Sequence, residues 1–197
     1  MSLFVKICGL TDHGAVETCV ESGVDAIGFV FAESPRRVEP GLAAELSSLV
    51  PAGIARVAVF RRPRPGDIDR VLDVFMPDVV QADHDHLSSR SDVRVLPVYR
   101  ETVDSNPEHR RFLYEGAVSG VGQLVDLERA AGVASLGEMV LAGGLRPDNV
   151  GRAIAMVKPF GVDVSSGVES EPGVKSPALI RSFVTAARVA GERLVSA

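Results

Sequence analysis

Residues 138–167 read EMVLAGGLRPDNVGRAIAMVKPFGVDVSSG, and this stretch decides the fold. An apolar run over 138–144 ends in two glycines, a helical pattern with an early proline covers 146–158, and a second apolar run covers 160–167. Near-continuous apolar runs are typical of parallel strands that are covered on both faces. The stretch therefore predicts a strand–helix–strand unit of a parallel sheet.

The same alternation runs through the rest of the chain. Six further apolar runs are expected to form strands, over residues 3–8, 25–31, 54–60, 77–82, 93–99 and 112–116. Clear helical patterns cover residues 11–23, 40–50, 65–76, 126–137 and 176–191. Two segments, 83–92 and 100–110, offer only a short or weak helix. Eight such units favour a single (β/α)8 TIM barrel, with shortened helices in units four and five, over a doubly wound open sheet.

The composition is that of one globular domain spanning residues 1–197. The chain is 46% hydrophobic and 24% charged, and its net charge of −5 argues against nucleic acid or an anionic membrane as a partner. It has no apolar run as long as a membrane span and no signal peptide. Cys8 and Cys19 make neither a disulfide framework nor a zinc spacing, so we expect a cytoplasmic protein.

Two loops near the C-terminus carry residues that suit a phosphate group. Gly143 and Gly144 follow the seventh expected strand, and Ser165, Ser166 and Gly167 follow the eighth. In barrels of this kind, the loops after these two strands commonly bind phosphate through backbone N–H groups. Glycine lets the backbone approach the anion closely, and serine hydroxyls add donors. A single Gly-Gly would indicate only a tight turn, but two such loops on successive strands predict a phosphate site.

Other polar residues also end expected strands, where the active site of a barrel lies. Cys8 ends the first strand and can act as a general base there, whereas Cys19 lies within an amphipathic helix and is read as an inert core residue. Glu115 ends the sixth strand and is the candidate acid. Asp126 is a second candidate but is better read as a helix cap. Asp163, at the end of the eighth strand, is assigned a supporting role.

Several arginines could bind a carboxylate. Arg36 follows the second strand and can clamp a carboxylate with two hydrogen bonds, and Arg37 and Arg100 are alternatives. The basic run over 61–64 is read as a solvated loop. The Asp and His residues over 83–86 lack the spacing of a helical zinc motif, so no metal is expected.

Four stretches carry a resemblance to a known family. KICGLTD, ESGVDAIGFVFAESPR, LAGGLRPDNV and PFGVDVSSGVESEPGVKS resemble the phosphoribosylanthranilate isomerases of tryptophan biosynthesis. The resemblance implies a (β/α)8 barrel that converts N-(5-phosphoribosyl)anthranilate into 1-(2-carboxyphenylamino)-1-deoxyribulose 5-phosphate by an Amadori rearrangement. It also implies that no cofactor or metal is used. The expected partner is a small phosphosugar substrate, and the expected state is a monomer or a homodimer.

The resemblance also implies roles for single residues. The catalytic cysteine of the K-I-C-G motif is Cys8. The family's L-L-D motif corresponds to FLYEG, so the general acid falls on Glu115, which is one methylene longer than aspartate. The next motif aligns Asp126 with a different aspartate, which supports Glu115 as the acid. Arg36 falls on the arginine that contacts the anthranilate carboxylate, and Asp83 stands where the family's V-Q-L-H-G has histidine.

The reaction needs an acid that protonates the ring oxygen and a base that removes the proton from C2. For these roles we expect Cys8 to have a lowered pKa and Glu115 to be neutral or to shuttle a proton. Two alternatives stay open. One is a related or dual-specificity phosphoribosyl aminoaldose isomerase, and the other is a non-catalytic paralogue that only binds phosphosugar.

Overall fold

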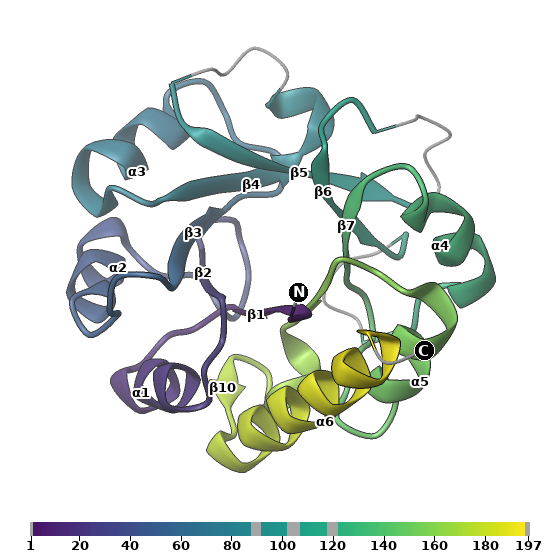
Figure 1. Ribbon diagram of the computed structural model, residues 1–197. Helices are drawn as coiled ribbons and strands as arrows, with labels where there is room; N and C mark the ends of the chain where they lie inside the picture. Colours follow the sequence, from purple (N-terminus) through teal and green to yellow (C-terminus); the bar gives the residue numbers. More distant parts are fainter. Residues whose placement is uncertain (1, 88–91, 102–106, 118–121, 196–197) are drawn as a thin grey trace.

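In the computed structural model, eight parallel strands close into a barrel in chain order, and helices surround it (Figure 1). The structure describes residues 2–87, 92–101, 107–117 and 122–195. The strands are β1 Phe4–Cys8, β2 Ala26–Val30, β3 Ala55–Val59, β4 Val79–Asp83, β5 Arg94–Arg100, β6 Arg111–Glu115, β7 Glu138–Leu141 and β8 Gly161–Val164. The closed barrel confirms the predicted fold. It rules out the alternative of an open, doubly wound sheet.

Six α-helices lie within the described residues. They are α1 His13–Glu21, α2 Pro40–Ser47, α3 Asp67–Phe75, α4 Leu127–Ala134, α5 Val150–Val157 and α6 Pro177–Val195. After β4 the chain makes only a short 3-10 helix, η1 His84–His86. Residues 101 and 107–110, between β5 and β6, contain no helix, and 102–106 lie outside the described residues. Unit four is thus shortened as predicted. None of these helices combines the length and the apolar character that crossing a membrane would need.

The strands carry two apolar layers because their side chains alternate in direction. One layer faces the helices and forms the large core, which includes Val5 and Ile7 of β1. The other layer fills the inside of the barrel, where Cys8 packs beside Ala26 and Val57. The alternation places Lys6 on the same inward face as Cys8. The fold therefore puts an ammonium group and a thiol inside the barrel from one strand.

A small hairpin that the sequence analysis did not predict follows β8. The chain first makes the 3-10 helix η2 Ser166–Val168, and then β9 Glu169–Glu171 pairs antiparallel with β10 Val174–Lys175. The turn of the hairpin is tied to the loop between β1 and α1, because the Thr11 hydroxyl donates to the Gly173 carbonyl oxygen at 3.2 Å. The hairpin therefore fixes the predicted phosphate loop against the loop that follows β1.

Candidate active site

The rim formed by the carboxyl ends of the strands is rich in ionisable side chains. Cys8, Asp83, Arg100 and Glu115 are the last residues of β1, β4, β5 and β6. The strands are parallel, so these ends lie at one face of the barrel, which is where barrel enzymes carry their active sites. The predicted positions of Cys8 and Glu115 at strand ends are confirmed.

A cavity of about 50 Å³ at this face brings most of the predicted site residues together. Its lining consists of Glu115 and of residues 122–123, 142–145 and 163–167. The candidate acid thus shares one small cavity with both predicted phosphate loops and with Asp163. Gly143 and Gly144 both have positive φ, of 94° and 65°, which glycine adopts without strain.

A larger cavity of about 550 Å³ opens over the same loops. It shares Gly144, Ser166 and Gly167 with the small cavity and adds Arg36 and Glu169 to the lining. Its volume is in the range of small-molecule sites, roughly 300–1,000 Å³. The two cavities therefore meet at the predicted phosphate loops.

Cys8 lies inside the barrel and is not among the residues that line these two cavities. Its neighbour Lys6 is fully buried and donates to Asp163 at 2.7 Å. On the adjacent strand, a side chain at Gly28 would meet Cys8 Sγ at 3.0 Å and Lys6 Nζ at 3.3 Å, so this glycine makes room for both groups. Asp163 therefore links the cavity that holds Glu115 to the pair formed by Lys6 and Cys8.

The protonation of Cys8 differs from the expectation. Burial raises the pKa of the Cys8 thiol above its ordinary value, while the ammonium groups of Lys6 and Lys175 act in the opposite direction. The prediction of a lowered thiol pKa is therefore wrong, because desolvation of the buried thiolate outweighs the attraction of the two lysines.

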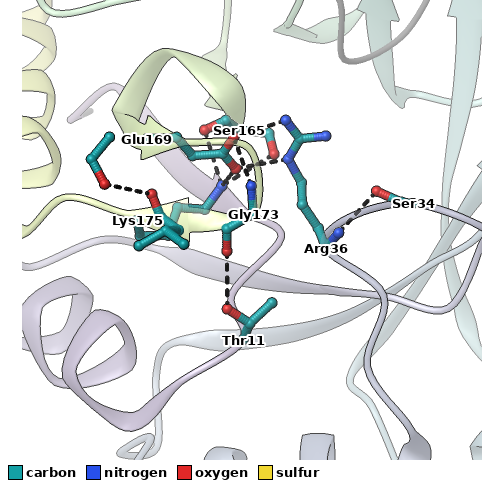
Figure 2. Close-up of polar contacts among 9 residues, drawn as sticks. Thr11, Ser34, Arg36, Ser165, Glu169, Gly173 and Lys175 are labelled. Carbon is teal, nitrogen blue, oxygen red and sulfur yellow. Dashed lines mark hydrogen bonds and ion pairs between the residues drawn. The ribbon is translucent and has the colours of Figure 1, made fainter.

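Arg36 belongs to an ion network that joins the loops after β2 and β8. Its Nε and Nη2 donate to the two carboxylate oxygens of Glu169 at 2.7 and 2.8 Å, and Lys175 Nζ donates to Glu169 at 2.6 Å (Figure 2). Lys175 also donates to the carbonyl oxygen of Ser165 at 3.0 Å. Burial raises the pKa of the Glu169 carboxyl, but the hydrogen bonds from Arg36 and Lys175 outweigh it and hold this pKa below its ordinary value.

The network leaves Arg36 able to bind a further anion. Its Nη1 makes no hydrogen bond within the described residues, and the side chain lines the larger cavity. One carboxylate faces two cations here, so the cluster carries an excess positive charge. The alternative Arg37 is instead exposed and pairs with Glu39 at 3.1 Å.

A second ion cluster lies on the other side of the rim. Arg100 Nη2 donates to Asp83 at 2.5 Å, and Nη1 of the same guanidinium donates to Glu115. Arg100 is therefore bound to the candidate acid and is not placed as an open carboxylate clamp. Asp126 caps α4, since its carboxylate accepts from the N–H groups of Glu128 and Arg129. The reading of Asp126 as a cap is confirmed.

The histidines after β4 show no metal-like arrangement. The His84 ring stacks on Tyr99, with ring centroids 4.6 Å apart. Across the described ranges, no group of three or more His, Cys, Asp or Glu side chains is placed to hold a metal ion.

Comparison with known proteins agrees with this geometry. The family model described as N-(5'phosphoribosyl)anthranilate (PRA) isomerase matches residues 5–186. The chain belongs to this family. The N-(5'-phosphoribosyl)anthranilate isomerase of Bordetella petrii is 39% identical, over 96% of this chain and 97% of its own length. The family resemblance that the motifs predicted is therefore confirmed.

Solved structures of the PRA isomerase family share the fold. One is a phosphoribosylanthranilate isomerase in complex with reduced 1-(o-carboxyphenylamino)-1-deoxyribulose 5-phosphate. It is 32% identical with a TM-score of 0.79, covering 95% of this chain and 99% of that one. Another contains monomers generated from the dimeric isomerase of Thermotoga maritima, at 31% identity and a TM-score of 0.80, with the same coverage.

Four residues of the site escaped the sequence analysis: Lys6, Gly28, Glu169 and Lys175. A signal existed for Lys6, because a strand puts residues two apart on the same face and Lys6 precedes Cys8 by two. No local signal existed for Glu169, whose partner Arg36 is 133 residues away in the chain.

Proposed function

We propose that Cys8 and Glu115 carry out the acid–base steps of the Amadori rearrangement in this member of the PRA isomerase family. The substrate is N-(5′-phosphoribosyl)anthranilate, and the reaction is a step of tryptophan biosynthesis. One observation carries the assignment. Glu115 shares a cavity with the predicted phosphate loops and with Asp163, and Asp163 is bonded to Lys6 beside Cys8.

The substrate is bound through its two anionic ends. Backbone N–H groups at Gly143, Gly144 and Gly167 and the hydroxyls of Ser165 and Ser166 surround the phosphate. Nη1 of Arg36 takes the anthranilate carboxylate, at the far side of the larger cavity. A phosphate and a carboxylate held at opposite ends fix the ribose ring over the strand ends, where the reacting groups lie.

Glu115 donates its proton to the ring oxygen, and the C1–O bond breaks with its electron pair going to that oxygen. The product of this step is an open-chain iminium. Cys8, as the thiolate, then takes the proton from C2, and the resulting enolamine tautomerises to the ketose. The Lys6 ammonium stabilises the thiolate, which burial otherwise disfavours. Asp163 holds Lys6 in place for this task.

The test is turnover of N-(5′-phosphoribosyl)anthranilate, followed by the loss of its fluorescence. Cys8→Ser and Glu115→Gln are each expected to lower kcat by about 10²–10⁴-fold, the usual worth of one general acid or base. Cys19→Ala is the matched control for a buried cysteine outside the site and should keep wild-type kcat. Wild-type turnover in either site variant contradicts the assignment of that residue.

We further infer that the chain functions as one domain in the cytoplasm, as a monomer or a homodimer, without a nucleic acid partner. The dimeric relative from Thermotoga maritima supports the homodimer. Light scattering on the purified protein decides between the two states, and fractionation of the source cells tests the location.

A further inference from the structure

Three neighbouring strands end in one ion cluster, made of Asp83 on β4, Arg100 on β5 and Glu115 on β6. Arg100 lies opposite Glu115 in the strand register, and its guanidinium donates to both carboxylates, at 2.5 Å to Asp83. The side chains are only 12, 14 and 16% exposed. Among the residues that the structure describes, two carboxylates thus share the Arg100 guanidinium in a partly desolvated place, and one of them is the proposed acid.

The cluster restricts where the Glu115 carboxyl can lie. Glutamate has one more rotatable bond than the aspartate of the family motif, so its carboxyl group has more positions to choose from. A charge-assisted hydrogen bond from Arg100 selects one of them. Arg100 is itself held from the far side by Asp83. The longer acid is therefore fixed by two residues of neighbouring strands.

The charges of Arg100 and Asp83 affect whether Glu115 can act as an acid. An arginine beside a carboxylate favours its ionised form, which cannot donate a proton. When Glu115 carries the proton, Arg100 keeps a neutralising partner because Asp83 remains bonded to it. We propose that Arg100 and Asp83 are positioning residues for the general acid: Arg100 fixes the Glu115 carboxyl, and Asp83 balances the charge of Arg100 while Glu115 is protonated.

Over the described ranges, no other charged group near Glu115 takes the place of Asp83 beside Arg100. Arg62, from the loop after β3, reaches Asp83 only at 3.9 Å and is mostly exposed. Glu101 continues from β5 and lies close to Gly116. Asp163 of β8 faces the same cavity but is bonded to Lys6. Directly after β7 the cavity is lined by Ala142 and Gly143, which carry no charge.

The proposal rests on the proposed roles of Cys8 and Glu115, and its test is the pH dependence of kcat/KM. An acid and a base together give a bell-shaped profile with two limbs. In Asp83→Asn the hydrogen bond to Arg100 can form but the negative charge is gone. We expect the limb that reports the titration of Glu115 to move to lower pH by on the order of one unit, because the negative neighbour that favours its protonated form is gone. The limb that reports Cys8 should stay in place, and kcat at neutral pH should fall about tenfold.

Arg100→Gln should shift the Glu115 limb in the opposite direction. Without the guanidinium charge, the ionised form of Glu115 loses a favourable neighbour while the Asp83 carboxylate stays nearby, so the same limb should move to higher pH. Asp78→Asn is the matched control, because Asp78 pairs with Arg56 at 2.9 Å near the start of β3 and β4, at the other end of the barrel. It should leave both limbs in place.

The outcomes separate the two proposals. Limbs that stay fixed in Asp83→Asn and Arg100→Gln, or that move in the same direction, overturn the role of these two residues even where kcat falls. Retained turnover in Cys8→Ser or Glu115→Gln overturns the proposed function instead. Thermal melting of each variant verifies that the folded protein is compared throughout.

Discussion

The barrel mouth holds two ion clusters of opposite balance. Around Glu169, two cations share one carboxylate, and the cluster borders the loops proposed to bind phosphate and carboxylate. Around Arg100, the described part of the chain places two carboxylates on one guanidinium, and one of these carboxylates is the proposed acid. The Glu169 cluster has an excess of positive charge, which suits an anionic substrate. In the Arg100 cluster one carboxylate can take up a proton while the other still pairs with the arginine. We therefore propose that the same kinds of side chain serve substrate binding on one side of the barrel mouth and proton transfer on the other.

The two clusters also differ in what they join. The Glu169 cluster ties the loop after β2 to the hairpin after β8, so it has a large effect on structure. The Arg100 cluster joins the ends of three strands that the barrel already holds in register. Breaking the first should therefore lower stability and binding, and breaking the second should mainly change the pH profile.

The largest expected effect comes from Glu169→Gln. Lys175 is fully buried and would lose its charged partner, and removing one member of a buried ion pair typically costs about 3–5 kcal/mol. For a chain of this size the melting temperature should fall by roughly 6–20 °C. Glu171→Gln, in the same hairpin but exposed, is the control and should change stability by less than about 0.5 kcal/mol. Equal melting temperatures for both variants would contradict a structural role of the Glu169 cluster.

A change in the shape of the loop after β8 should weaken substrate binding. A Cβ at Gly167 would lie 1.8 Å from the Leu145 carbonyl oxygen, so Gly167→Ala must displace the phosphate loop. We expect KM to rise roughly 10–100-fold, equivalent to about 1.4–2.8 kcal/mol of binding, with the pH limbs unchanged. Gly41→Ala is the control, since no atom lies within 4 Å of its Cβ position in α2. Steady-state kinetics of the two variants would contradict the loop's role if their KM values agreed.

Inorganic phosphate tests whether ligand binding depends on the phosphate loops alone or also on Glu115. At a concentration 100 times its Kd, a ligand that binds only the folded state adds about 2.7 kcal/mol. A rise in melting temperature with phosphate, over chloride at equal ionic strength, is expected for the wild type and for Glu115→Gln. It should be absent in Gly167→Ala. Loss of the effect in Glu115→Gln would show that the two sides are not independent. A phosphate effect without turnover in the wild type would favour the non-catalytic paralogue.

The sequence predicted the parts of the molecule that repeat or follow a local rule. Eight alternating apolar and helical patterns predicted the barrel, and paired glycines and serines after the last two strands predicted loops that the structure places around one cavity. Cys8 and Glu115 were selected as candidates because barrels place chemistry at strand ends, and both residues do end their strands. These inferences need only the order of residues along the chain.

The rest depends on contacts between distant segments. Glu169 and Lys175 lie in a hairpin whose only local signal is the Pro172–Gly173 pair, which favours a turn. Nothing near Arg36 in the chain indicates that it pairs with Glu169. The direction of the Cys8 pKa also escaped prediction, since it follows from burial and from the distance to Lys6, which the sequence does not give.

The smallest effect is the pH dependence of the Glu169 contribution to stability. Its pKa is lowered in the folded protein, so the folded state binds fewer protons than the unfolded chain as the carboxyl titrates. The contribution is therefore complete above the unfolded pKa of about 4.3 and is lost as the pH falls through the lower folded value. The difference in melting temperature between wild type and Glu169→Gln should be constant from pH 7 to 5 and shrink below about pH 4.3. Glu171→Gln should show no such trend. A difference that persists unchanged to pH 3 would mean that the carboxylate charge of Glu169 does not hold Arg36 and Lys175 together.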